Sequence, residues 1–105
     1  MNNNLEEKLK ELKKGYIKKL EVVLSELKTL LTDKNLAINE IYLKVHTISG
    51  TSGMYGLKDI SEVSTEFEFY LKPIKENPDV ANREELKNNF SNYIDFLEKT
   101  ISIGE

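Results

Sequence analysis

A helical spacing of apolar residues runs along the whole chain and restricts it to an all-α fold. Apolar side chains recur at steps of three and four, with charged residues between them, as on one face of an amphipathic helix. In the N-terminal third, these positions are Leu5, Leu9, Leu12, Tyr16, Leu20, Val23, Leu27 and Leu30. They predict a long first helix over about residues 4–31, with a slight bend expected at Gly15. No segment shows the alternation of a strand.

Three further helices are expected, separated by residues that break helices. The polar run 32–35 ends the first helix, and Asn35 is the expected cap of a second helix over about residues 36–52. Residues 53–56 form the next turn, and a third helix covers about residues 57–75, where Pro73 should kink or end it. The run 77–79 is a strong break before a fourth helix over about residues 80–102.

Four amphipathic helices with short connections predict an antiparallel up-down four-helix bundle. Residues 1–105 are expected to form it as one domain. The positions predicted to face inward from the last three helices are Ile38, Ile41, Tyr42, Val45, Ile48, Ser52, Leu57, Ile60, Val63, Phe67, Leu71, Ile74, Leu86, Phe90, Tyr93, Ile94, Leu97 and Ile101.

Composition excludes several classes of function. The net charge of −3 provides no basic surplus for a nucleic-acid partner. The absence of cysteine excludes disulfides and thiolate chemistry. No apolar run is long enough to cross a bilayer, and the start of the sequence does not have the pattern of a secretory signal. We therefore expect a cytoplasmic protein without a membrane partner.

His46 is the one histidine, and it is followed by glycines at positions 50, 53 and 56. On the second helix it falls at the edge of the apolar stripe, so its imidazole should face solvent beside the small Gly50. Hydrolysis would need a pocket and partner groups, and a metal site would need more ligands than one histidine. Phosphoryl acceptance needs only an exposed, oriented nitrogen. An ordinary surface histidine remains the alternative at this point.

The pattern His46-x-x-x-Gly50-x-x-Gly53-x-Tyr55-Gly56-Leu57 resembles that of histidine-containing phosphotransfer (HPt) domains, including those of chemotaxis-type kinases. The similarity continues through residues 57–63, and the segments 16–20 and 24–27 of the first helix are also HPt-like. The resemblance thus covers essentially the whole chain, although the motif around the histidine is its specific part.

The resemblance implies a role for each matching residue. His46 would carry the phosphoryl group on Nε2, Gly50 would let a receiver domain approach, and Gly53 and Gly56 would shape the turn. Glu68, 22 positions after the histidine, would accept a hydrogen bond from the imidazole Nδ1. The partners implied are a receiver domain of a response regulator, a histidine kinase, or both. The module would be a monomer without catalytic activity or a cofactor of its own, and any Mg²⁺ would come with the partner.

One position departs from the family pattern. Ser49 stands where the family usually has a lysine, so a hydroxyl replaces a positive charge near the phosphoryl group. Lys44 and Lys72 are the candidates for a substitute cation. The expected docking surface comprises Tyr42, Ile48, Ser49, Gly50, Gly53 and Met54, although Ile48 could instead belong to the core. The alternatives are a degenerate module that binds partners without accepting phosphate, and a helical adaptor or oligomerisation domain.

Overall fold

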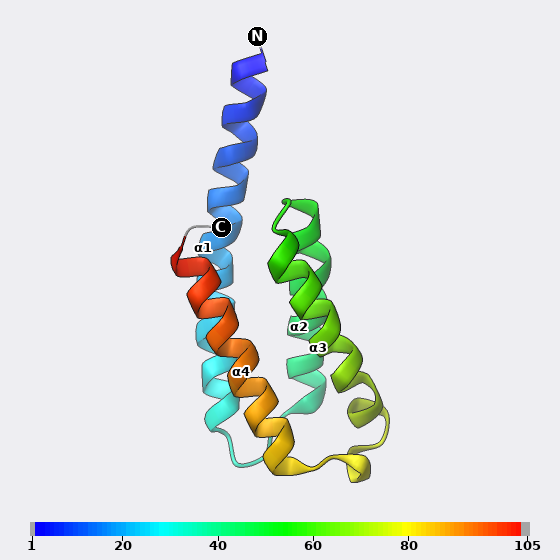
Figure 1. The fold of residues 1–105 in the computed structure, drawn as a ribbon. Helices are drawn as coiled ribbons and strands as arrows, with labels where there is room; N and C mark the ends of the chain where they lie inside the picture. The colour runs from blue at the N-terminus through cyan, green and yellow to red at the C-terminus, as the bar shows by residue number, and fades with distance from the viewer. Residues whose placement is uncertain (1, 104–105) are drawn as a thin grey trace.

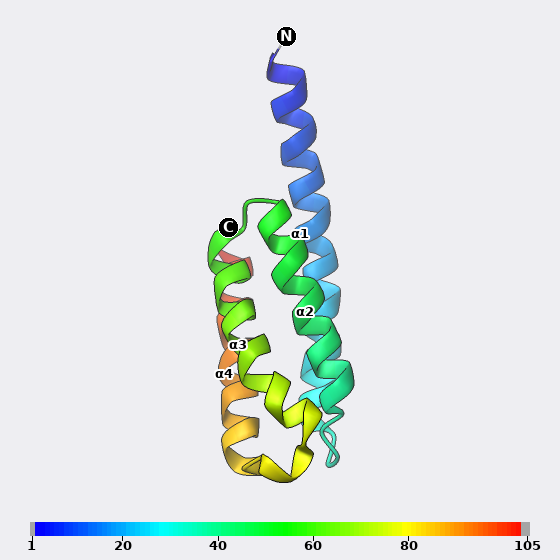
Figure 2. The same cartoon turned by 90° about the vertical axis from the view of Figure 1, so that its right-hand side faces the viewer.

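The computed structural model describes residues 2–103 and forms an antiparallel four-helix bundle (Figure 1). The helices are α1 (Asn2–Thr32), α2 (Ile38–Met54), α3 (Lys58–Glu76) and α4 (Arg83–Ser102), with a short 3₁₀ helix, η1 (Pro78–Val80), before the last. No strand occurs among these residues. The expected all-α bundle is confirmed. Viewed from the side, α2 and α3 form a close antiparallel pair (Figure 2).

The core contains the apolar positions that the helical spacing predicts for the last three helices, except Tyr42, which is only partly buried and stacks beside His46. Phe90, Leu97, Ile41 and Leu71 are almost completely inaccessible to solvent. The Phe67 ring packs on Tyr93 with a centroid distance of 4.7 Å, which joins α3 to α4. Buried Tyr93 shares a hydrogen bond of 2.6 Å with the buried Ser64 hydroxyl, so neither polar group is left unpaired.

The N-terminal turns of α1 differ from the expectation. Leu5, Leu9 and Leu12 lie on one face, as the spacing requires, but they are 64%, 56% and 56% exposed. This part of α1 extends beyond the ends of the other helices (Figures 1 and 2). Periodicity predicts that residues share a face, and it does not predict that another helix covers that face. The core contribution of α1 therefore begins near Tyr16 and continues through Leu20, Leu24 and Leu27.

Two helix ends also differ from the expected boundaries. Asn35 does not cap α2, which begins at Ile38 after the N-cap residue Ala37 and without a side-chain cap. The fourth helix begins at Arg83 rather than near residue 80, because the Asn82 side chain accepts a hydrogen bond from the Glu85 N–H at 3.1 Å. That bond is the N-terminal capping interaction of α4. The preceding residues form η1 instead.

The turn between α2 and α3 is a Schellman motif built on Gly56. The helix ends at Met54, one residue later than the turn was expected to begin, so Gly53 is helical. Gly56 has φ +74°, a left-handed conformation that other residues rarely adopt. The N–H of Gly56 donates to the Gly53 carbonyl at 3.2 Å, and that of Leu57 donates to the Ser52 carbonyl at 2.9 Å. Leu57 is fully buried, which fixes where α3 starts relative to α2.

Candidate functional site

The imidazole of His46 projects from the middle of α2, on the side that faces α3. Its side chain is 64% exposed, so a reacting group can reach it without opening the fold. The ring of Tyr42, one turn earlier on α2, stacks beside the imidazole with a centroid distance of 6.1 Å. Gly50, one turn later on α2, has open space at the point where a side chain would begin.

Glu68 on α3 holds the imidazole from the opposite helix. Its Oε2 lies 2.8 Å from the Nδ1 of His46, and its side chain is only 19% exposed. An ionised carboxylate can only accept a hydrogen bond, so Nδ1 carries the proton that is donated. In this tautomer, the lone pair of the neutral imidazole lies on Nε2. The contact therefore selects which nitrogen is available to attack a phosphorus atom.

Ser49 does not lie open beside the imidazole. Its hydroxyl is 2.5 Å from that of Thr65 on α3, and the Thr65 hydroxyl itself donates to the Ser61 carbonyl at 2.8 Å. Since Thr65 has only one proton, Ser49 must be the donor in its bond to Thr65. The ring closes through the Ser61 hydroxyl, which donates to the Ser49 carbonyl at 2.9 Å. The hydroxyl proton of Ser49 is therefore already engaged in a hydrogen bond that links α2 to α3.

The two candidate cations have different surroundings. Lys44 points toward α1, where its Nζ lies 3.4 Å from Oε2 of Glu26, on the side of α2 away from Glu68. Lys72 is exposed and lies one helical turn after Glu68, on the same side of α3. Of the two, only Lys72 lies on the same side as the imidazole.

A third cation was not anticipated from the sequence. The Nζ of Lys75 lies 4.7 Å from the centre of the Tyr42 ring, which itself stacks beside His46. The cation therefore packs against the aromatic neighbour of the imidazole. Its spacing of 33 residues from Tyr42 carried no signal in the sequence, because the contact depends on how α2 and α3 are aligned.

The two glycines in α2 have different surroundings. A Cβ added to Gly50 would meet no atom within 4 Å, whereas one added to Gly53 would lie 3.2 Å from Oγ of Ser61. Gly50 is therefore an open surface position, and Gly53 allows α2 and α3 to approach closely. Met54 is 84% exposed at the end of α2. Ile48 is 2% exposed and belongs to the core, so it is not part of a docking surface.

Two exposed apolar residues near the imidazole were missed. Leu43, one turn before His46, is 62% exposed, and Phe69, next to Glu68, is 68% exposed. Neither lies at a position predicted to face inward, but a single exposed apolar residue is common on protein surfaces and does not by itself indicate docking. Together with Met54 they put apolar surface on the outer sides of α2 and α3.

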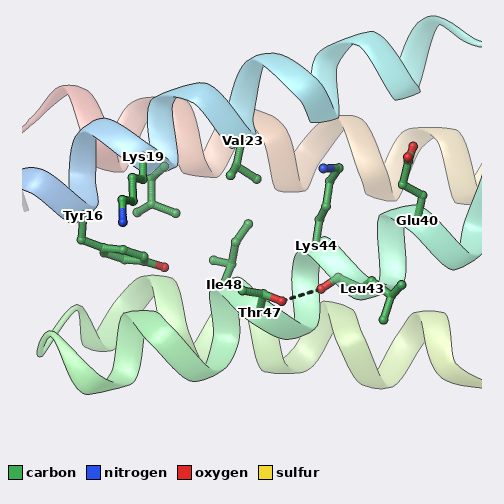
Figure 3. A pocket seen from close by; sticks show the side chains of 9 residues that line it. Tyr16, Lys19, Val23, Glu40, Leu43, Lys44, Thr47 and Ile48 are labelled. Carbon is green, nitrogen blue, oxygen red and sulfur yellow. Dashed lines mark hydrogen bonds between the residues drawn. The ribbon is translucent and has the colours of Figure 1, made fainter.

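An apolar groove of about 390 Å³ lies between α1 and α2, away from Glu68. Tyr16, Val23, Leu43 and Thr47 are among its lining residues, and the Thr47 hydroxyl donates to the Leu43 carbonyl at 3.0 Å (Figure 3). The imidazole of His46 does not line it. In the part of the chain that the structure describes, no group of three potential metal ligands occurs, and no helix is long and apolar enough to cross a membrane.

Comparison with protein families decides the classification. The family model described as the Hpt domain matches residues 11–99, which include both His46 and Glu68. The chain belongs to the Hpt domain family. Hpt domains are phosphocarrier modules of two-component signalling, and they are not catalysts in their own right. Comparisons with curated proteins and with solved structures give no match.

Membership in the Hpt family gives the exposed imidazole a chemical context. Hpt domains interact with receiver domains and with kinases.

Proposed function

We propose that this chain is a cytoplasmic phosphocarrier that accepts a phosphoryl group on Nε2 of His46 and exchanges it with the aspartate of a receiver domain. The observation that carries the proposal is the 2.8 Å contact between Nδ1 of His46 and Glu68, combined with the exposure of the imidazole. A solvated surface histidine would not need a largely buried carboxylate on its inner nitrogen.

The transfer step uses the tautomer that Glu68 selects. The lone pair on Nε2 attacks the phosphorus of the acyl phosphate, and the bond from phosphorus to the aspartate oxygen breaks. The aspartate leaves as a carboxylate with the bonding electron pair. The imidazole then carries a positive charge, which the carboxylate of Glu68 stabilises through the proton on Nδ1. The reverse step passes the group to another receiver.

Lys72 supplies the positive charge that the family's usual lysine would provide at the position of Ser49. Its ammonium group is exposed and lies one turn from Glu68, within the reach of a long flexible side chain. Tyr42 stacks beside the imidazole, and Lys75 in turn packs over the Tyr42 ring. Gly50 and Met54 contribute to the surface on which the receiver docks, with Leu43 and Phe69 as its apolar contacts.

Phosphoryl transfer from a phosphorylated receiver domain tests this function. Wild type should become labelled, with a label that is labile in acid and stable in base, and His46→Gln should remain unlabelled. Label on His46→Gln, or no label on wild type from any of a broad panel of receivers and kinases, would contradict the proposal. The second result would favour an adaptor whose partner binding is unchanged in His46→Gln.

The role of Glu68 has its own test. Glu68→Gln keeps a hydrogen-bond acceptor, whereas Glu68→Ala removes it. We expect Glu68→Ala to slow transfer by roughly tenfold to a hundredfold, which corresponds to about 1.5–3 kcal/mol for a charge-assisted hydrogen bond. Glu68→Gln should fall between Glu68→Ala and wild type. Equal rates in all three proteins would show that Glu68 does not orient the imidazole.

A further inference from the structure

The N-terminal turns of α1 carry an uncovered stripe of leucines, Leu5, Leu9 and Leu12. They are 64%, 56% and 56% exposed, and this part of the helix extends past the rest of the bundle (Figures 1 and 2). Leu5 and Leu9 also lie outside residues 11–99, which the family model matches. Phosphotransfer on His46 therefore gives no account of this stripe.

The projecting part of α1 gains stability when its apolar face is covered, because most helical stability in proteins comes from packing of that face. The steps of four and three between Leu5, Leu9 and Leu12 form the seam of a two-stranded coiled coil. In heptad terms, Leu9 occupies an a position, while Leu5 and Leu12 occupy d positions. The next a position is Tyr16, where α1 enters the bundle.

The charges that flank the seam select one orientation of a second copy. Glu6 and Lys13 occupy e positions, and Lys8 occupies a g position. A parallel pair would place Lys8 of each chain against Lys13 of the other, which is repulsive. An antiparallel pair places e against e, so Glu6 of each chain meets the second copy's Lys13. The g position that faces Lys8 is then Gly15, which has no charge.

In this antiparallel pairing, the N-terminal end of the second copy's helix reaches a hollow on the surface of the first copy. When Leu9 packs against the second copy's Leu12, the second copy's Leu5 lies level with Tyr16. At that level, Leu12, Gly15, Tyr16 and Tyr55 are among the residues that line a hollow of about 420 Å³ between α1 and α2. A Cβ on Gly15 would meet no atom within 4 Å, so this side of α1 is open to an approaching helix.

We propose that the projecting part of α1 is a self-association surface on which two copies of this chain pair in antiparallel orientation through Leu5, Leu9 and Leu12. The surface is small by the standard of stable dimers, so the association is weak and depends on concentration. This proposed dimer differs from the monomer that the resemblance to HPt domains implies. The pairing uses α1, whereas each His46 lies on the side of α2 that faces α3. Both His46 side chains therefore stay accessible in the dimer.

Sedimentation of the full chain over about 10 μM to 1 mM tests the proposal. Wild type should pass from monomer to dimer, and Leu9→Lys should remain monomeric. Lys13→Glu makes both cross-chain contacts repulsive and should weaken dimerisation by about tenfold. Combining it with Glu6→Lys should restore the wild-type affinity. Lys14→Glu makes the same charge change on the exposed opposite face and serves as the control, with little expected effect.

Three results would overturn the antiparallel dimer. The first is a wild type that stays monomeric across the whole range. The second is stronger association of Lys13→Glu, because a parallel pair would gain a contact between Lys8 and the new glutamate. The third is an assembly larger than a dimer. Circular dichroism of each variant separates loss of association from loss of helix. Transfer to His46 is independent of all three results.

Discussion

Replacing Gly50 by alanine should make the protein more stable and test whether this glycine serves docking rather than folding. Gly50 lies inside α2, where glycine costs about 0.5–1 kcal/mol relative to alanine. The added methyl group would meet no atom within 4 Å, so no packing penalty offsets that gain. For a chain of this length, a gain of about 0.5–1 kcal/mol in the free energy of unfolding corresponds to an increase in Tm of about 2–8 °C.

Gly53→Ala is the matched control on the same helix. Its methyl group would lie 3.2 Å from Oγ of Ser61, which is tighter than an ordinary contact. The hydroxyl cannot turn away freely, because it donates to the Ser49 carbonyl at 2.9 Å. Losing that hydrogen bond costs about 1 kcal/mol, which cancels the gain in helix propensity. We therefore expect no increase in the Tm of Gly53→Ala.

Thermal and urea unfolding of wild type and the two variants measure these differences, with far-UV circular dichroism as the probe. Transfer rates from a phosphorylated receiver complete the comparison. Gly50→Ala should transfer more slowly than wild type, and Gly50→Arg should block transfer with helicity intact. A Tm for Gly50→Ala at or below that of wild type would refute the account of stability. Undiminished transfer by Gly50→Arg would refute the docking role.

Three other perturbations have defined outcomes. Lys72→Met should shorten the lifetime of the phosphohistidine severalfold, measured as loss of label, whereas Lys44→Met should leave it unchanged; equal lifetimes would contradict the role of Lys72. Ser49→Ala should lower the free energy of unfolding by about 1 kcal/mol and change transfer little, and a large loss of transfer would mean that the hydroxyl contacts the phosphoryl group. Burial raises the pKa of the Tyr93 hydroxyl above its usual value of 10, so the unfolded chain loses this proton first as the pH rises. The contribution of the Tyr93 hydroxyl to the free energy of unfolding is therefore complete below about pH 10 and should fall by about 1.4 kcal/mol per pH unit above it. Urea unfolding measures this slope, and Tyr93→Phe should reduce it. An unchanged slope in Tyr93→Phe would show that Tyr93 is not its source.

The helices and the core of the bundle were predictable because they depend on local spacing. Phe90, Leu71 and Ile41 are buried where the helical pattern places them. The uncovered Leu5 and Leu9 show the limit of that reasoning, since the pattern is the same whether or not a neighbour is present. The late start of α4 follows from the Asn82 cap, which was readable from the sequence but was overlooked.

The candidate site was predictable only in part, for a similar reason. The motif around His46 and the position of Glu68 followed from a family resemblance that fixes spacing along the chain. The engagement of Ser49 by Thr65, 16 residues away, depends on the alignment of two helices. So does the stacking of Lys75 on Tyr42. Contacts of this kind become visible only after the helices are placed side by side.

The exposure of the His46 imidazole also bears on the direction in which phosphoryl groups flow. A nitrogen whose side chain is 64% exposed has no enclosure to retain a product or to exclude one partner in favour of another. Access to the nitrogen is then the same for capture and for release. On the proposed function, net flux follows the ratio of phosphorylated to unphosphorylated partners, so that changes in their abundance would reverse it without any change in the carrier.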